Sequence, residues 1–225
     1  NVGDLVLGNA GELSGFTSIN GDIEIITTGS IEVEGLRTGG SIQLTATTGY
    51  IWGGPDTEVL DIEGQTVELI SEIGLGTTGS GALDISADHL VLVNGSTASA
   101  YLNVYGSTTI AGLDLAGPGS LFLRVTDGNL TMSGINSVYG GDAVIQVRGD
   151  FSITGNLLVS GELRLTAESI SGMGSSVESS NGSIHLRSVG AIDFDALSTV
   201  VAGSGTINTL SGTNTIVGLI HAGVR

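Results

Sequence analysis

The sequence contains no cysteine and no lysine, only 2 prolines, and aromatic residues make up 4% of its 225 residues. Without cysteine the chain forms no disulfide. No apolar run approaches the roughly 18 residues that a membrane-spanning helix needs, so we expect no membrane insertion. Because aromatics are so few and glycines number 38, an ordinary helical or doubly wound core is disfavoured.

Basic residues are also scarce, since 6 arginines stand against 23 acidic residues and the formal net charge is -17. Such a chain repels nucleic acid, which we exclude as a partner. The imbalance is uneven: residues 1–100 hold 14 acidic residues and one arginine, whereas residues 101–225 hold nine and five. We expect an acidic, solvated surface toward one end of the molecule.

What the chain does contain is a repeat of short strands with alternating apolar residues and a period of about 20 residues, typical of solenoids. The predicted inward anchors of the first strand in each repeat are Ile23, Ile42, Val67, Leu83, Leu102, Leu121, Ala143, Leu163, Ile184 and Ile207. A second strand follows each, marked by Ile31, Ile51, Ile73, Leu90, Ile110, Leu130, Phe151, Ile170, Ile192 and Ile216. Each coil therefore carries at least two strands.

Glycines recur between the two strands of a repeat, at Gly29, Gly49, Gly128, Gly149 and Gly190. We expect them to form corners at positive φ. Asn-Gly and Asp-Gly hairpin signals are too isolated for an antiparallel meander. The prediction is an all-β fold, a right-handed parallel β-helix of about ten coils, with a β-sandwich as its rival. Residues 1–225 form one domain, in which 1–21 are an irregular start or a partial first coil and 22–220 form the coils.

Several phrases of the repeat resemble filamentous haemagglutinin-type exoproteins, the large bacterial adhesins of two-partner secretion. The phrases are DIEIITTGSIEV (22–33), SIQLTATTGYI (41–51), SLFLRVTDGNLTM (120–132), ELRLTAESISG (162–172) and SIHLRSVGAIDF (183–194). The similarity spans about residues 22–220, and other right-handed β-helices share its alternation and glycine placement. It implies an extracellular or cell-surface, non-enzymatic rod.

Catalytic or metal-binding clusters are not evident. The histidines His89, His185 and His221 lack metal-ligand spacing, and we expect no cofactor. A polysaccharide-active β-helix is the enzyme alternative, with Asp193 and Asp195 facing outward and with arginines Arg124, Arg164 and Arg187 lining one outer face. We predict that the protein is not an enzyme. The outward pairs Glu32/Glu34 and Asp61/Glu63 predict weak, diffuse binding of divalent cations.

Outward positions of the first strand indicate a binding surface more than any motif does. They read Glu24, Gln43, Glu68, Asp84, Asn103, Phe122, Val144, Arg164, His185 and Asn208. Tyr101 and Tyr105 flank Asn103, so with Phe122 and Val144 they predict an exposed apolar patch, unless a loop covers it. Tyr50 and Trp52 bracket Ile51 before an irregular insertion (53–64), where they could stack a sugar ring or pack under their own loop.

The tripeptide Arg148-Gly149-Asp150 is one that many integrins recognise. Integrin binding requires a protruding loop, whereas Gly149 coincides with a corner of the repeat. Both interpretations stay open at this point.

Two functions follow from this sequence. The first is an adhesin-type or structural rod that presents lateral surfaces to a cell-surface protein or glycan. The second is a fibre subunit that binds itself end to end through the apolar layers Leu5/Leu7 and Ile216/Leu219.

Overall fold

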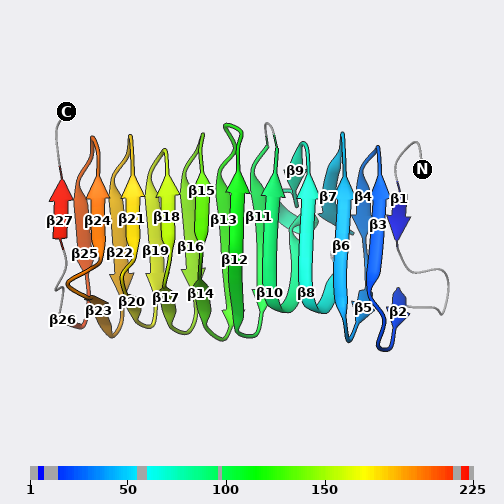
Figure 1. Ribbon diagram of the computed structural model, residues 1–225, viewed down its shortest axis with the longest axis horizontal. Coiled ribbons are helices and arrows are strands. Elements are labelled where there is room, and N and C mark those ends of the chain that lie inside the picture. Colours follow the sequence, from blue (N-terminus) through cyan, green and yellow to red (C-terminus); the bar gives the residue numbers. More distant parts are fainter. Residues whose placement is uncertain (1–4, 8–14, 55–59, 96–97, 215–218, 223–225) are drawn as a thin grey trace.

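The computed structural model describes residues 5–7, 15–54, 60–95, 98–214 and 219–222. Its 27 strands pair in parallel within one continuous sheet that winds into a β-helix of about 9 turns. The described residues contain no α-helix, only the short 3-10 helix η1 (Gly79–Gly81). In Figure 1 the chain rises in the front strands and descends behind them as it advances from the N-terminus to the C-terminus, which is a right-handed winding. The predicted fold class is confirmed.

Each coil of the first half contributes a strand, or half of a long strand, to each of three ladders, which we call A, B and C. Ladder A begins with β1 (Leu5–Leu7), β4 (Ile31–Val33), β7 (Tyr50–Gly53) and β9 (Gly74–Leu75). Ladder B begins with β3 (Ile23–Thr27), β6 (Ser41–Ala46) and the second halves of β8 (Ile62–Ser71) and β10 (Leu83–Asn94). Ladder C contains β2 (Phe16–Ser18), β5 (Leu36–Thr38) and the first halves of β8 and β10.

Coils of the second half also have three strands, but the faces are divided differently. Ladder A continues as β11 (Ala100–Tyr105), β13 (Leu121–Asp127), β16 (Ala143–Val147), β19 (Leu163–Ala167), β22 (Ile184–Ser188) and β25 (Ile207–Leu210). Ladder B reaches β12 (Thr108–Leu115) and then splits. One branch is β14 (Leu130–Met132), β17 (Phe151–Ile153), β20 (Ile170–Gly172), β23 (Ala191–Phe194) and β26 (Thr213–Asn214). The other is β15 (Ile135–Val138), β18 (Asn156–Val159), β21 (Ser176–Ser179), β24 (Thr199–Ala202) and β27 (Leu219–Ala222).

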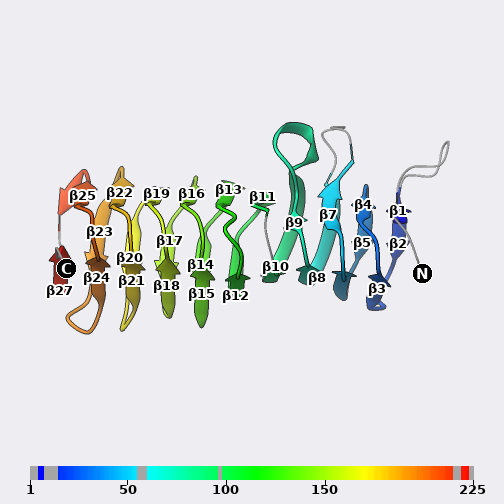
Figure 2. The same cartoon turned by 90° about the horizontal axis from the view of Figure 1, so that it is seen from above.

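The two halves meet at β11 and β12. Strand β11 pairs with β9 of ladder A through Ala100 and with β10 of ladder C through Leu102 and Val104, so ladders A and C merge there. Strand β12 pairs with the second half of β10, with a register shift between Leu90 and Val91. Figure 2 shows the segment between β9 and β10, which carries η1, projecting beyond the neighbouring coils.

This joint corrects the predicted alignment of anchors. Val67 lies beside Leu90 and not beside the expected Leu83, whereas Leu83 pairs with Leu102. Leu121 likewise pairs with Ala100 and not with Leu102. The single strand β10 spans what the repeat predicts as two separate strands, because its long alternating run bends through a corner without a glycine. A fixed spacing therefore slips into the wrong ladder at this point.

Elsewhere most anchors are in the predicted register, but Ile110 pairs with Met132 and not with the expected Leu130. Leu121, Ala143, Leu163, Ile184 and Ile207 align in ladder A, and Leu130, Phe151, Ile170 and Ile192 align in one branch of ladder B. In the first half, Ile31 and Ile51 pair, but their next neighbour is Leu75 and not Ile73. Ile216 lies outside the described residues. Buried apolar side chains fill the interior from Ile23 to Ala202, which explains why alternation with period 2 predicts the strands.

The corner glycines serve a different purpose from the one predicted. Of the five, only Gly128 has a positive φ, at 113°. At Gly149 the limiting factor is space, since a Cβ atom there would lie 2.3 Å from Asn129 Oδ1 and 2.5 Å from the Gly128 carbonyl oxygen. Successive corners are stacked so closely that a side chain does not fit between them.

Candidate binding face of ladder A

Three residues of the predicted patch lie side by side on the outer face of ladder A. Tyr101 of β11 pairs with Phe122 of β13, and Phe122 pairs with Val144 of β16. The rings of Tyr101 and Phe122 are parallel within 3°, with centroids 4.7 Å apart. Strands in a sheet are about 4.8 Å apart, so flat rings at equivalent positions are already at stacking distance. Phe122 is 38% exposed, and the patch borders a depression of about 160 Å³ that Ala82 and Asn103 also line.

Tyr105 does not belong to this patch. A register shift after Val104 places it opposite Asp127, four residues farther along β11 than Tyr101. There it lines a separate depression of about 340 Å³ with Glu63, Asp88 and other polar residues of the first half. The prediction that all four residues gather is therefore wrong for Tyr105, because alternation along one strand indicates a shared face but not proximity.

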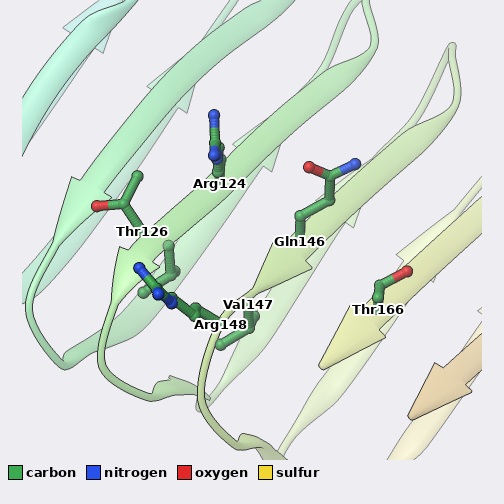
Figure 3. A pocket seen from close by; sticks show the side chains of 7 residues that line it. Arg124, Thr126, Gln146, Val147, Arg148 and Thr166 are labelled. Atoms are coloured by element: carbon green, nitrogen blue, oxygen red, sulfur yellow. The ribbon is translucent and has the colours of Figure 1, made fainter. Parts of the chain in front are cut away.

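A shallow groove of about 260 Å³ lies beside the aromatic patch on the same ladder. Its lining side chains come from three coils, and Figure 3 shows most of them projecting from the outer face of the strands. They are Arg124, Val125, Thr126, Gln146, Val147, Arg148 and Thr166. The register places Arg124 beside Gln146 and Gln146 beside Thr166, so these three form one row along the rod.

Arginines on this face are not equivalent. Arg164 of β19 donates to both carboxylate oxygens of Glu162, at 2.7 Å from Nε and 3.3 Å from Nη2. His185 Nε2 lies 3.0 Å from the same carboxylate. The hydrogen bond from Arg164 lowers the pKa of Glu162. In contrast, Arg124 and Arg148 form no ion pair with any described residue. Sequence inspection named Arg124, Arg164 and Arg187 for one outer face but missed Arg148 as a member of the groove.

Aligning the sequences of β13 and β16 in the observed register would have identified Arg148 as a groove residue. When LFLRV (121–125) is set against AVIQV (143–147), Arg124 falls beside Gln146, and Arg148 is the next residue of that coil. The observed register also corrects the predicted outward row, in which Phe122 followed Asn103. Asn103 lies beside Asp84 and Arg124, and its Nδ2 donates to Asp84 Oδ1 at 2.8 Å.

Arg148-Gly149-Asp150 follows β16 at a stacked corner. The Gly149 N–H donates to the Gly128 carbonyl at 3.0 Å, and the Asp150 N–H donates to Asn129 Oδ1 at 2.8 Å. Asp150 Oδ1 accepts a hydrogen bond from Ser169 Oγ at 2.6 Å. The tripeptide thus lies against neighbouring coils on both sides and is not a protruding loop.

Tyr50 and Trp52 form the predicted aromatic pair on β7, in the first half of the rod. Their rings meet edge to face, with centroids 6.4 Å apart and planes at 75°. Both are half-buried, and Ile51 between them is fully buried. Tyr50 packs over Gly74, where a Cβ atom would lie 2.8 Å from the ring. Part of the insertion that follows, residues 55–59, lies outside the described residues.

One of the acidic pairs predicted to face the solvent differs from the prediction. Asp61 of the pair Asp61/Glu63 is buried, with 5% of its surface exposed. Desolvation is the largest cause that raises its pKa from near 3.8 to about 7, and the charges of Asp84 and Glu34 add to it. Hydrogen bonds from the backbone N–H groups of Asp84 and Gly54 act in the opposite direction. Within the described part of the chain, no group of three or more His, Cys, Asp or Glu side chains is placed to hold a metal ion.

Asp193 and Asp195, the two carboxylates considered for a polysaccharide-active enzyme, have different environments. Asp193 is exposed, whereas Asp195 accepts hydrogen bonds from the Gly174 N–H at 3.0 Å and from Ser198 Oγ at 2.6 Å. The bond from Ser198 is the largest cause that lowers the pKa of Asp195. Asp195 therefore holds two neighbouring turns together.

No helix among the described residues is long and apolar enough to cross a membrane.

No protein-family model, curated protein or solved structure matches this chain. The fold is that of a β-solenoid, and the likeness to filamentous haemagglutinin-type exoproteins rests on the repeat phrases of the sequence.

Proposed function

We propose that this protein is an extracellular, non-catalytic rod of adhesin type, related to filamentous haemagglutinin-like exoproteins, that binds a cell-surface protein or glycan through the outer face of ladder A. The stacked pair of Tyr101 and Phe122 carries the proposal. An aromatic ladder that is 38% exposed at Phe122 and bordered by polar residues is typical of a recognition surface. The stacking also holds both rings in place, so little side-chain entropy is lost on binding.

Replacing both rings tests the proposal. The double variant Tyr101→Ser/Phe122→Ser should weaken adhesion of the purified rod to cells or glycan-coated surfaces by about thirtyfold, since each buried aromatic contact contributes on the order of 1 kcal/mol. Tyr139→Ser is the matched control, because Tyr139 is 56% exposed but lies after β15, outside ladder A. Unchanged circular dichroism verifies the fold. Equal adhesion of the double variant and the wild-type protein would refute the proposal.

The absence of catalysis is part of this proposal. The groove beside the aromatic patch is lined by arginine, threonine, glutamine and valine, without a carboxylate or imidazole to act as general acid or base. We expect no cleavage of acidic polysaccharides, measured as new chain ends over several hours. Turnover that disappears in Asp193→Ala would establish an enzyme instead.

A fibre subunit is the second candidate. Strands β25, β26 and β27 pair on one side with β22, β23 and β24 and have no described partner on the other. Leu210 on β25 is 62% exposed. In a longer chain the next coil would cover this edge, and for this chain alone a second copy can do so. Filaments that are visible by electron microscopy and are lost in Leu210→Asp would favour this function, whereas the ladder A variants should leave such filaments intact.

A further inference from the structure

Four of the six arginines of this acidic protein project from one ladder. They are Arg124 of β13, Arg148 after β16, Arg164 of β19 and Arg187 of β22. The register aligns Arg124, Gln146, Thr166 and Arg187 in a single outward row. The sheet therefore concentrates basic charge on one face of a molecule with a net charge of -17.

The groove contains two arginines of this set that form no ion pair with a described carboxylate. Arg164 is held by Glu162, and Arg37 in the first half pairs with Glu63 at 3.6 Å. Arg124 and Arg148 both line the groove and have no carboxylate partner within the described residues. Each guanidinium offers five N–H donors in a planar fork that fits a carboxylate.

The distances between the arginine residues indicate which kind of anion fits the groove. Arg148 lies one coil and two residues away from Arg124, so their Cα atoms are about 8 Å apart from strand geometry. Arg124 and Arg187 are three coils apart in the same row, about 14 Å. Between these cations stand neutral groups that bond to hydroxyls, namely the Gln146 amide and the Thr166 hydroxyl. A row that alternates sparse positive charge with neutral hydrogen-bonding groups matches a sugar chain with spaced carboxylates.

We propose that the groove binds a linear polysaccharide that carries carboxylates, as polyuronates do, with Arg124 and Arg148 pairing with carboxylates and Gln146 and Thr166 bonding to sugar hydroxyls. This inference rests on the proposed function and names its ligand class. A densely sulfated polymer fits less well, because the net charge of -17 repels a high density of negative charge. The same repulsion opposes docking of a second copy through its acidic half.

Titration with oligogalacturonate, followed by calorimetry in a buffer with EDTA to remove bridging cations, tests the proposal. Arg124→Gln and Arg148→Gln should each weaken binding about fivefold to tenfold, as loss of one charge-assisted contact predicts. Arg37→Gln removes the same charge from β5, outside ladder A, and should leave binding unchanged. Raising NaCl from 20 to 300 mM should weaken wild-type binding, because exposed ion pairs are screened. Circular dichroism verifies that each variant is folded.

Four results would overturn the inference: no binding of oligogalacturonate, equal weakening by Arg37→Gln, tighter binding of dextran sulfate than of oligogalacturonate, or self-association of the protein that the groove variants abolish. These experiments distinguish a failure of the polysaccharide inference from a failure of the proposed function. If the rod adheres to cells through Tyr101 and Phe122 but ignores oligogalacturonate, the ligand class alone is wrong. If adhesion is also independent of the two rings, the proposed function falls as well.

Discussion

Asp61 is a buried carboxyl group whose surroundings favour the neutral, protonated form over the charged form. Its Oδ2 atom accepts the Asp84 N–H at 2.9 Å, and Gly53 packs so closely that a Cβ atom there would lie 2.3 Å from the same oxygen. Water is excluded from this side of the carboxyl, and the nearby charges of Asp84 and Glu34 repel a third negative charge. Folding therefore favours neutral Asp61.

The stability of the protein should consequently depend on pH in an unusual direction for a carboxyl. Its pKa rises from near 3.8 in the unfolded chain to about 7 in the fold, so the stabilising effect of neutral Asp61 is complete below about pH 4 and is lost as the pH rises to about 7. The free-energy difference is on the order of 4 kcal/mol. Denaturant unfolding at pH 5 and pH 8 should show most of this loss in the wild-type protein, since part of it already occurs below pH 5, and much less of it in Asp61→Asn.

Glu63→Gln is the control for that experiment, because Glu63 is an exposed neighbour in an ion pair with Arg37. It should keep the wild-type dependence on pH. A profile of Asp61→Asn that follows the wild-type profile would show that another group titrates.

Corners decide how closely successive coils approach. Gly149 separates β16 from β17 and lies directly over Gly128, and the Gly149 N–H donates to the carbonyl of that residue at 3.0 Å. Gly112 lies within β12, where a Cβ atom would meet only Val91 Cγ1, at 4.0 Å. Both are glycines of the same rod, yet only the first is required for steric reasons.

The variant Gly149→Ala should destabilise the protein by about 1–3 kcal/mol, because the added methyl group forces two backbone segments apart. Gly112→Ala should be neutral or slightly stabilising, since alanine restricts the unfolded chain. Chemical denaturation of both variants measures the difference. Equal losses would mean that corner stacking is not the reason for glycine at position 149.

The whole molecule is a rod with unequal ends, and its net charge of -17 acts on the folded state as self-repulsion. Stacked coils bring some acidic residues that are far apart in the sequence within one Debye length of each other, about 8 Å at 0.15 M salt. Asp84 lies against Asp61, and Glu162 lies against Asp142. Charges that are far apart along the sequence therefore repel in the fold more than in the unfolded chain.

Salt should for this reason stabilise the rod. Raising NaCl from 10 to 150 mM at pH 8 should increase the melting temperature by a few degrees, since a change of 1 kcal/mol corresponds to about 2–4 °C for a chain of this size. Differential scanning calorimetry measures it, and sucrose at equal osmolality controls for effects other than screening. A melting temperature that falls with salt would show that attractive ion pairs outweigh the repulsion.

The fold class can be predicted from the amino-acid sequence, because apolar alternation with a period near 20 residues is a local signal that repeats in every coil. The sequence also placed Tyr101, Phe122 and Val144 on one face, and Tyr50 and Trp52 together. Three features become visible only in the folded chain: the register across β10, the burial of Asp61 and the placement of Arg124 and Arg148 in one groove. These depend on contacts between coils, where one inserted residue or one corner without glycine shifts every later neighbour.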